Sequence, residues 1–239
     1  MKHELTLEEK AKFISSSNYI ESIYLDYELT LNILKEPENY VNINLYDNLS
    51  DNSWRSYVVT DHENALDYIL SFENRELVIC DVIKNIHGIL MKNQYANFDV
   101  MSGTYRSNFV KVGPVKKDEF FWYYYQAPAP KQIKNYMQQL EEKMICLDDK
   151  KNVSESDCWD IHDFFENIHP FSDGNGRTGR LLLNLLRLRY DLSFKNISSE
   201  KVKKYYKHIG DYGEKLGIGS IIKQENPFMT IFLQSPNFH

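Results

Sequence analysis

A short polar loop between two apolar segments constrains the fold of this chain most. The loop, residues 169–180, reads His-Pro-Phe-Ser-Asp-Gly-Asn-Gly-Arg-Thr-Gly-Arg. After it, residues 181–186 read Leu-Leu-Leu-Asn-Leu-Leu, which is apolar on nearly every side of a helix and predicts a central buried helix. Before it, a capping-box-like start at Ser154 predicts a helix that runs to Ile168. The sequence therefore predicts a helix-loop-helix, with the second helix starting near Arg177 or Thr178.

The composition is that of an ordinary globular protein. The 239 residues, 42% hydrophobic and 26% charged, suit one sizeable core or one domain with an extension. A net charge of −6 argues against a general nucleic-acid binder. The three cysteines are widely spaced and form no Cys-x-x-Cys pair, so we expect neither a disulfide framework nor a zinc site. No stretch approaches the roughly 20 apolar residues of a membrane span, and the N-terminus has no apolar signal core, so we expect a cytoplasmic protein without a membrane partner.

Helical periodicity recurs through most of the chain. Residues 8–35 predict two helices, separated at residues 15–18 (Ser-Ser-Ser-Asn), with Ser17 or Asn18 as the N-cap of the second. Pro37 should end that second helix near Lys35. A connector is expected over residues 40–51. Further helices are expected over residues 63–71, 76–91, 133–146, 199–210 and 219–232.

Residues 101–130 have a different character. Residues 109–113 and 120–124 are β-prone, and residues 114–118 between them can turn. Pro128 and Pro130 follow. The segment therefore predicts a β-hairpin in an otherwise helical protein.

The polar loop combines groups suited to phosphate chemistry. His169 can accept or donate a proton near neutral pH. The glycines of Gly-Asn-Gly let the backbone form a concave anion site at the start of a helix. Arg177 and Arg180 are three residues apart and can point at one phosphate chain, and Asp173 can hold Mg²⁺ against it. Each residue alone is more often structural than functional, but together they indicate a nucleotide-handling catalytic loop.

The loop matches, without a gap, the pattern His-x-Phe-x-(Asp/Glu)-Gly-Asn-Gly-Arg-x-x-Arg, and in this it resembles Fic-domain proteins. The resemblance implies a mainly α fold, with a Fic (Fido) helical core and a β-hairpin flap beside the active site. It implies transfer of AMP from ATP to a Ser, Thr or Tyr hydroxyl of a protein. On this basis we expect an N-terminal helical extension over residues 1–75 and a Fic domain over residues 76–239.

The resemblance also assigns roles within the loop. His169 would deprotonate the target hydroxyl, and Asp173 would hold Mg²⁺ that bridges the α- and β-phosphates. Arg177 would pair with the phosphates, Arg180 would reach the γ-phosphate, and Phe171 would anchor the loop in the core. The remaining nucleotide-binding residues of the loop would be Gly174, Asn175 and Gly176, which form the anion hole, with Thr178 and Gly179.

Two other regions extend the resemblance. The segment from Gly103-x-Tyr105-Arg106 to Val112 and Gly113 is similar to the family's flap, where an edge strand would pair with an extended target segment. Val112 and Gly113 are expected at the nucleotide. Further along, Tyr205 and Tyr206 lie where relatives place aromatic residues near the adenosine, whereas Gly213 stands where some relatives carry a nucleotide-contacting Asn.

An N-terminal segment resembles the family's inhibitory motif, (Ser/Thr)-x-x-x-Glu-(Gly/Asn). It begins at Ser17 and contains Glu21. By this resemblance Glu21 pairs with Arg180 and blocks the productive placement of the γ-phosphate. Ser22 departs from the motif, and Gly or Asn would more readily take a special backbone conformation there.

The leading hypothesis is a protein adenylyltransferase that uses ATP and Mg²⁺, is inhibited by Glu21 and can modify itself. The same site could instead remove AMP from a modified target, with Glu21 orienting a water, or transfer another phosphate-containing group. The non-enzymatic alternative is a catalytically silent nucleotide-binding module. Neither the protein target nor the oligomeric state follows from the sequence.

Overall fold

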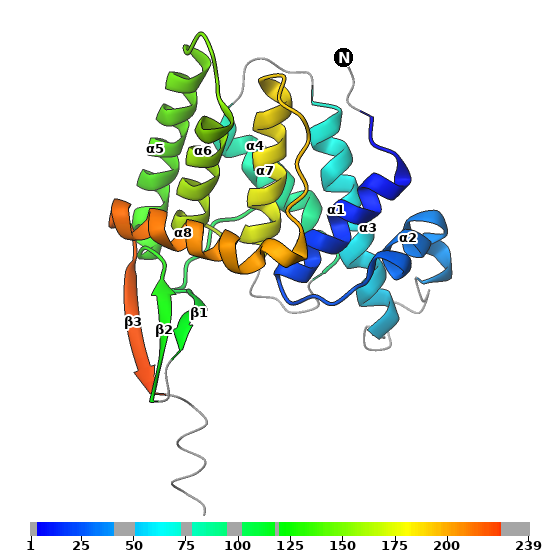
Figure 1. The fold of residues 1–239 in the computed structure, drawn as a ribbon, viewed down its shortest axis with the longest axis horizontal. Coiled ribbons are helices and arrows are strands. Elements are labelled where there is room, and N and C mark those ends of the chain that lie inside the picture. Colours follow the sequence, from blue (N-terminus) through cyan, green and yellow to red (C-terminus); the bar gives the residue numbers. More distant parts are fainter. Residues whose placement is uncertain (1–3, 41–50, 73–77, 95–101, 118–119, 226–239) are drawn as a thin grey trace, which may run out of the picture.

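A computed structural model describes residues 4–40, 51–72, 78–94, 102–117 and 120–225. These residues are mainly helical and include a small antiparallel sheet (Figure 1). This confirms the predicted mainly α fold with a β-hairpin. In chain order the elements are α1 (Leu7–Ile20), α2 (Tyr27–Lys35), the 3₁₀ helix η1 (Pro37–Asn39), α3 (Asp51–Leu70), α4 (Ile79–Leu90), β1 (Lys111–Lys117), β2 (Phe121–Gln126), α5 (Pro130–Asp148), α6 (Glu155–Ile168), α7 (Asn175–Arg189), the 3₁₀ helix η2 (Ser199–Lys201), α8 (Val202–Leu216) and β3 (Ser220–Glu225).

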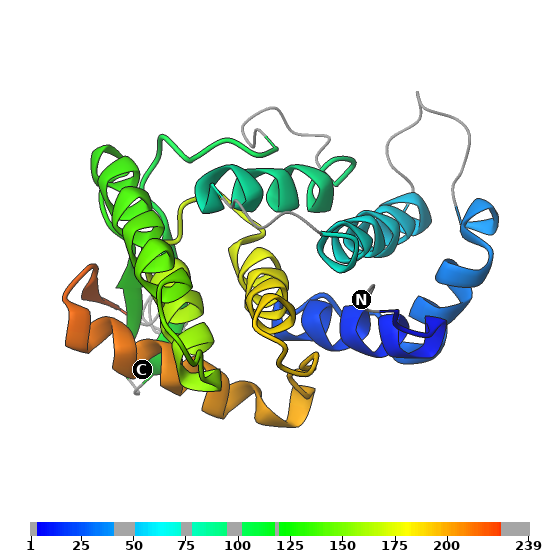
Figure 2. The same cartoon turned by 90° about the horizontal axis from the view of Figure 1, so that it is seen from above.

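Helix α7 is central and buried, as predicted from its apolar sequence. Its residues 175–188 are all buried. Leu182 and Leu186 pack into a core formed with α4, α5, α6 and α8, whereas Leu181 and Leu185 pack into a second core formed with α1, α2, α3 and α4. Figure 2 shows α7 standing between these two groups of helices. The loop that precedes α7 is therefore attached to a helix held on both sides.

The N-terminal helices share an apolar core with α4 and α7. The boundary predicted between residues 75 and 76 lies within residues 73–77, outside the described ranges, and it stays a prediction. The connector predicted over residues 40–51 lies mostly outside them as well.

The helix break predicted at residues 15–18 is wrong. Helix α1 continues to Ile20, and the side chain of Asp26, not Ser17 or Asn18, caps α2. Ser17 and Asn18 are buried within α1 instead of ending it: the Ser17 hydroxyl accepts from Arg180, and Oδ1 of Asn18 lies 3.4 Å from Nδ1 of His62. The predicted end of the second helix at Lys35 is confirmed.

Other predicted boundaries are corrected by tertiary contacts. The helix predicted over residues 219–232 is a strand in its described part, β3, because Ile221 and Ile222 pair with β2. Helix α8 continues past residue 210 until Gly217 ends it with a φ of 64°. Helix α3 begins at Asp51, well before the predicted residue 63, and α7 begins at Asn175.

The predicted hairpin is present, with a third strand added to it. The strand order is β1-β2-β3, and both pairs are antiparallel. Residues 114–117 continue β1 and do not turn, although the pairing with β2 is irregular between Val112 and Lys116. A proline in a strand lacks an N–H group for the ladder and is tolerated on an edge. Within the described part of the chain, β1 is such an edge strand.

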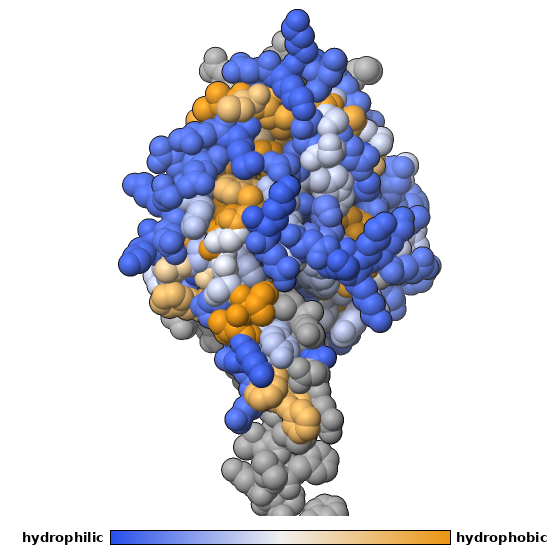
Figure 3. Space-filling model, turned by 60° about the vertical axis from the view of Figure 1, so that its left-hand side comes forward, coloured by the Kyte–Doolittle hydropathy of each residue, from blue (hydrophilic) through white to orange (hydrophobic). Residues whose placement is uncertain are grey.

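The surface beside the sheet is mainly hydrophilic. On the face drawn in Figure 3, apolar side chains appear in small groups separated by polar ones. None of the helices in the described ranges is long and apolar enough to cross a membrane.

Candidate active site

The loop between α6 and α7 is fixed by two residues with left-handed backbone and one side-chain amide. His169 caps the end of α6 with φ 51° and ψ 60°, and Gly174 precedes α7 with φ 71°. A Cβ at Gly174 would lie 2.7 Å from the sulfur of Met91, so a larger residue would have to displace the Met91 side chain and adopt a strained positive φ. Asn175 closes the loop: its Oδ1 accepts from the Phe171 amide at 2.9 Å, and its Nδ2 donates to the Phe171 carbonyl at 2.8 Å. Phe171 is fully buried, as expected of the anchor.

The loop borders a cavity of about 1210 Å³. The cavity is lined by the end of α1, the sheet, α6, α7 and α8. It brings together residues predicted for the inhibitory segment, the flap, the loop and the adenosine site. The predicted site residues that line it are Glu21, Val112, Gly113, His169, Gly176, Arg180, Tyr205 and Tyr206. The predicted residues outside its lining are Ser17, Asp173, Gly174, Asn175, Arg177, Thr178 and Gly179.

His169 is held as a neutral imidazole at pH 7. Burial, together with the nearby charge of Arg106, lowers the pKa of His169 to about 4. Glu21 and a backbone hydrogen bond with Glu166 oppose that shift. A neutral imidazole has a free ring nitrogen and can accept a proton, as a general base must.

Arg180 is buried below the cavity, with its side chain 2% exposed. Its Nε donates to the hydroxyl of Ser17 at 2.9 Å, and its Nη2 donates to the Ser17 carbonyl at 2.9 Å. Nη2 also forms an ion pair with the Glu21 carboxylate at 2.7 Å. The third nitrogen, Nη1, is buried and has no hydrogen-bond partner among the residues that the structure describes. The guanidinium therefore keeps a donor for a further acceptor.

The Glu21 carboxylate lies against the N-terminus of α7. A Cβ added to Gly176 would overlap the carboxylate, so the two groups are in direct contact. No side chain caps α7 through a hydrogen bond. The first N–H groups of a helix lack partners within it and carry a partial positive charge, which favours an anion. Glu21 therefore stands where this helix end would attract a phosphate.

Asp173 and Arg177 lie on the other side of the loop. The Asp173 carboxylate accepts from the Gly174 amide at 2.6 Å. Within the described ranges no group of three or more His, Cys, Asp or Glu side chains could hold a metal ion. One carboxylate fits Mg²⁺ all the same, because this ion commonly takes one or two carboxylates together with substrate phosphates. Arg177 donates to Gln94 at 2.6 Å and contacts Met91, so its guanidinium faces the segment that follows α4.

The two tyrosines predicted near the adenosine have different surroundings. Tyr205 is buried, with its hydroxyl 3.0 Å from Nε2 of His162. Tyr206 is half-exposed, and its hydroxyl donates to the Ile20 carbonyl at the end of α1 at 2.7 Å. Nearby, a Cβ on Gly213 would overlap the side chain of Asn167, so the absence of an Asn at residue 213 has a steric reason.

Three buried residues around the loop were given no role in the sequence analysis, where only Arg106 was named, as part of the segment similar to the flap. His87 stacks on Phe171, with ring centroids 3.7 Å apart, and its Nε2 lies 3.1 Å from the Asp173 carbonyl. Glu166 lines the cavity, and burial raises its pKa to about 7. Arg106 contacts the loop backbone. Several polar residues within the apolar helix α6 were a usable signal for Glu166, because buried polar groups need partners.

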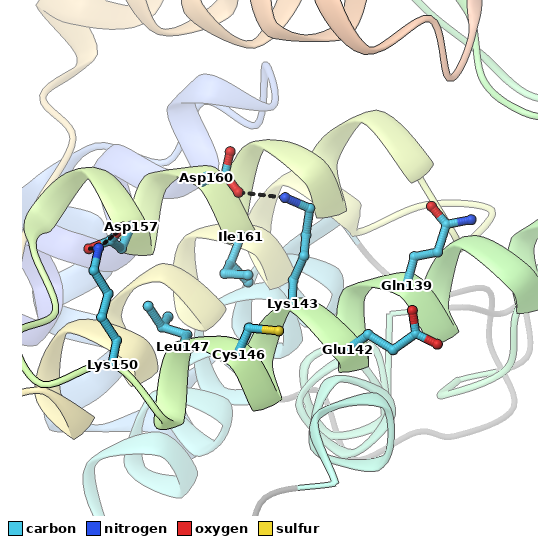
Figure 4. A pocket seen from close by; sticks show the side chains of 9 residues that line it. All are labelled: Gln139, Glu142, Lys143, Cys146, Leu147, Lys150, Asp157, Asp160 and Ile161. Atoms are coloured by element: carbon cyan, nitrogen blue, oxygen red, sulfur yellow. Dashed lines mark hydrogen bonds and ion pairs between the residues drawn. The ribbon is translucent and has the colours of Figure 1, made fainter.

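A second hollow, between α5 and α6, lies away from this loop (Figure 4). Its charged side chains pair with each other: Lys143 with Asp160 at 2.8 Å, and Lys150 with Asp157 at 2.7 Å. These pairs include four of the five charged side chains in the hollow, and the fifth, Glu142, accepts from Gln138 at 3.5 Å.

The structure is a helical fold in which a buried histidine and the N-terminus of a central helix line one cavity. Residues 78–186 match the Fic/DOC family. Over 142 residues the chain is 28% identical to a "probable protein adenylyltransferase" of Aquifex aeolicus, covering 56% of this chain and 37% of that protein. Residues 78–186 of the chain are therefore similar to a Fic domain. The chain spans little more than a third of the length of this curated relative.

Solved structures share the fold. A Fic domain containing signaling protein from Bacteroides thetaiotaomicron has a TM-score of 0.65 and 22% identity, covering 84% of this chain and 70% of that one. Fic-1 from C. elegans has a TM-score of 0.64 and 19% identity, covering 85% of this chain and 56% of that one. The similarity extends beyond residues 78–186 and agrees with the shared core of the N-terminal helices.

Proposed function

We propose that this protein transfers AMP from ATP to a Ser, Thr or Tyr hydroxyl of a protein. The observation that carries the proposal is a neutral His169 in the same cavity as the N-terminus of α7 and the unpartnered Nη1 of Arg180. The name of the Aquifex aeolicus relative and the family match support the choice of AMP as the transferred group.

In the proposed reaction, His169 accepts the proton of the target hydroxyl as its oxygen attacks the α-phosphorus of ATP. A bond forms between that oxygen and the phosphorus, and the bond to the bridging oxygen breaks, so that pyrophosphate leaves. The N–H groups at the start of α7 and the Arg180 guanidinium bind the negative phosphates. Asp173 would hold Mg²⁺, which neutralises phosphate charge when bound. General-base help by His169 is worth on the order of 10²–10⁴ in rate.

We further propose that Glu21 inhibits this reaction within the same chain. Its carboxylate pairs with Arg180 and lies against Gly176, so it competes with the γ-phosphate for the guanidinium and the helix end. The edge of β1 beside Val112 and Gly113 would receive an extended segment of the target.

The position of the label in ATP tests the reaction. The Glu21→Gly protein is incubated with Mg²⁺, host lysate and ATP labelled on either the α- or the γ-phosphate. We expect protein-bound label from the α-phosphate alone, with the mass increase of AMP on a hydroxyl residue. His169→Ala should remove the label, whereas His208→Ala, a change at an exposed histidine paired with Asp163, should keep it.

Other results would assign another function. Label from the γ-phosphate would indicate phosphotransfer, and AMP release from a pre-modified protein would indicate the reverse reaction. Nucleotide binding without any transfer in the Glu21→Gly protein would indicate a silent binding module.

A further inference from the structure

Arg106 is a buried arginine whose donors all point at backbone carbonyls. Arg106 is 4% exposed. Its Nε donates to the His169 carbonyl, its Nη1 to the Asn108 carbonyl and its Nη2 to the Pro128 carbonyl, each at 2.8 Å. Its own amide donates to the Pro170 carbonyl at 2.9 Å. One side chain and its backbone therefore join two separate segments of the chain.

The carbonyls that Arg106 binds belong to the hairpin and to the loop. Asn108 precedes β1, and Pro128 follows β2, so the guanidinium holds both ends of the hairpin. The carbonyls of His169 and Pro170 lie directly after α6. Nη2 of Arg106 also reaches the carbonyl of Ile168, the last residue of α6, at 3.5 Å. The last carbonyls of a helix lack partners within it and carry partial negative charge, which suits an arginine.

His169 needs such support because its backbone is left-handed, with φ 51°. This conformation is uncommon for residues other than glycine, and it persists where the surrounding contacts hold it. The Arg106 bonds to residues 169 and 170 supply contacts of this kind. The planar fork of arginine makes them in fixed directions, which a lysine ammonium does not reproduce.

The charge of Arg106 also acts on the His169 ring. After burial, Arg106 is the largest cause of the low pKa of His169. Its cation disfavours a second positive charge on the imidazole and keeps the base unprotonated at neutral pH.

We propose that Arg106 is a positioning residue that fixes His169 relative to the β-hairpin and keeps its imidazole ready to accept a proton. The proposal rests on the proposed transfer reaction, in which the hairpin edge presents the target hydroxyl to His169. Arg106 lies outside the lining of the cavity and acts through His169.

Two substitutions in the Glu21→Gly protein separate the positioning of His169 by Arg106 from the effect of the Arg106 charge on the His169 pKa. Arg106→Lys keeps the charge and loses the fork, so we expect kcat to fall about 10- to 100-fold, with KM for ATP changed less than about threefold. Arg106→Gln removes the charge, so we expect the pKa of His169, followed by NMR titration of its ring, to rise. Arg189→Lys, which alters an arginine paired with Asp148, is the matched control and should change neither quantity.

The titration does not depend on transfer activity. If the Glu21→Gly protein transfers no AMP, the proposed function fails, while the His169 titration still tests the role of Arg106. An unchanged titration in Arg106→Gln, or an unchanged kcat in Arg106→Lys, would overturn the proposal. If Arg106→Gln does not fold, Arg106→Lys tests the proposal alone: its kcat should fall, and the pKa of His169 should stay low because the charge is kept.

Discussion

Arg180 has one set of contacts that stays when Glu21 is removed. Ser17 accepts from both Nε and Nη2, so the guanidinium remains oriented without the carboxylate. Removing Glu21 then leaves Nη1 and the start of α7 open to a ligand. A phosphate that reaches Nη1 and replaces the Glu21 carboxylate at Nη2 would therefore need no rearrangement of Arg180.

The residue after the inhibitory glutamate carries backbone strain. Ser22 has φ 61°, a region that glycine enters at no steric cost. We expect Ser22→Gly to raise the free energy of unfolding by about 0.5–1 kcal/mol in urea denaturation. Ser16→Gly, within α1, should lower it by about 0.5 kcal/mol because glycine is a poor helix former. Equal losses in both variants would show that Ser22 is not left-handed in solution.

Among the elements, α6 has a local start signal that can be tested. Ser154 accepts from the Asp157 amide, and the Asp157 carboxylate accepts from the Ser154 amide at 2.8 Å. We expect Ser154→Ala to lower the free energy of unfolding by about 1 kcal/mol, measured by thermal or urea denaturation. Ser156→Ala, at a helix position without a capping bond to the backbone, should change it by less than about 0.5 kcal/mol. An equal effect of the two changes would contradict the capping role.

The elements that the sequence predicted correctly are those with local signals. The capping box of α6 and the apolar run of α7 lie within the elements themselves. The continuity of α1 depends on Arg180, 163 residues away from Ser17, and β3 depends on pairing with β2. Such partners outweigh local propensity, so the helix break and the C-terminal helix were predicted wrongly.

In the site, too, local sequence signals predicted correctly, and contacts between distant segments could not be predicted. The Fic motif predicted which loop residues to consider, and eight of the predicted site residues line one cavity. The roles of Arg106 and Glu166 depend on backbone carbonyls and burial that no spacing reveals. The direction of the Arg177 side chain likewise depends on Gln94, which lies after the end of α4.

For the whole molecule, the two cores that meet on α7 join α1, the loop that begins at His169 and the start of α7 in one structure. Binding of a ligand in the cavity should therefore change the free energy of unfolding through groups buried near α7.

Glu166 makes that stability depend on pH. Burial raises its pKa from the ordinary 4.5 to about 7, against the effects of His162 and Arg180. The folded state then binds more protons than the unfolded state between these values, so this group lowers the free energy of unfolding as pH rises from about 4.5 to about 7. In Glu166→Gln no carboxyl titrates at this position, so the free energy of unfolding does not fall for this reason as pH rises. We expect its stability relative to the wild type to rise by about 1–3 kcal/mol between pH 5 and pH 8 in urea denaturation. A constant difference across this range would contradict a buried, titrating Glu166.

The central claim is that Glu21 and the γ-phosphate compete for Arg180 in a site that transfers AMP. The most direct measurement compares self-labelling from α-labelled ATP and Mg²⁺ in the wild type, Glu21→Gly and His169→Ala. We expect Glu21→Gly to exceed the wild type by on the order of 10²-fold, because misplaced phosphates slow the reaction by about this factor, and His169→Ala to remain unlabelled. Equal labelling of the wild type and Glu21→Gly, or labelling of His169→Ala, would contradict the account.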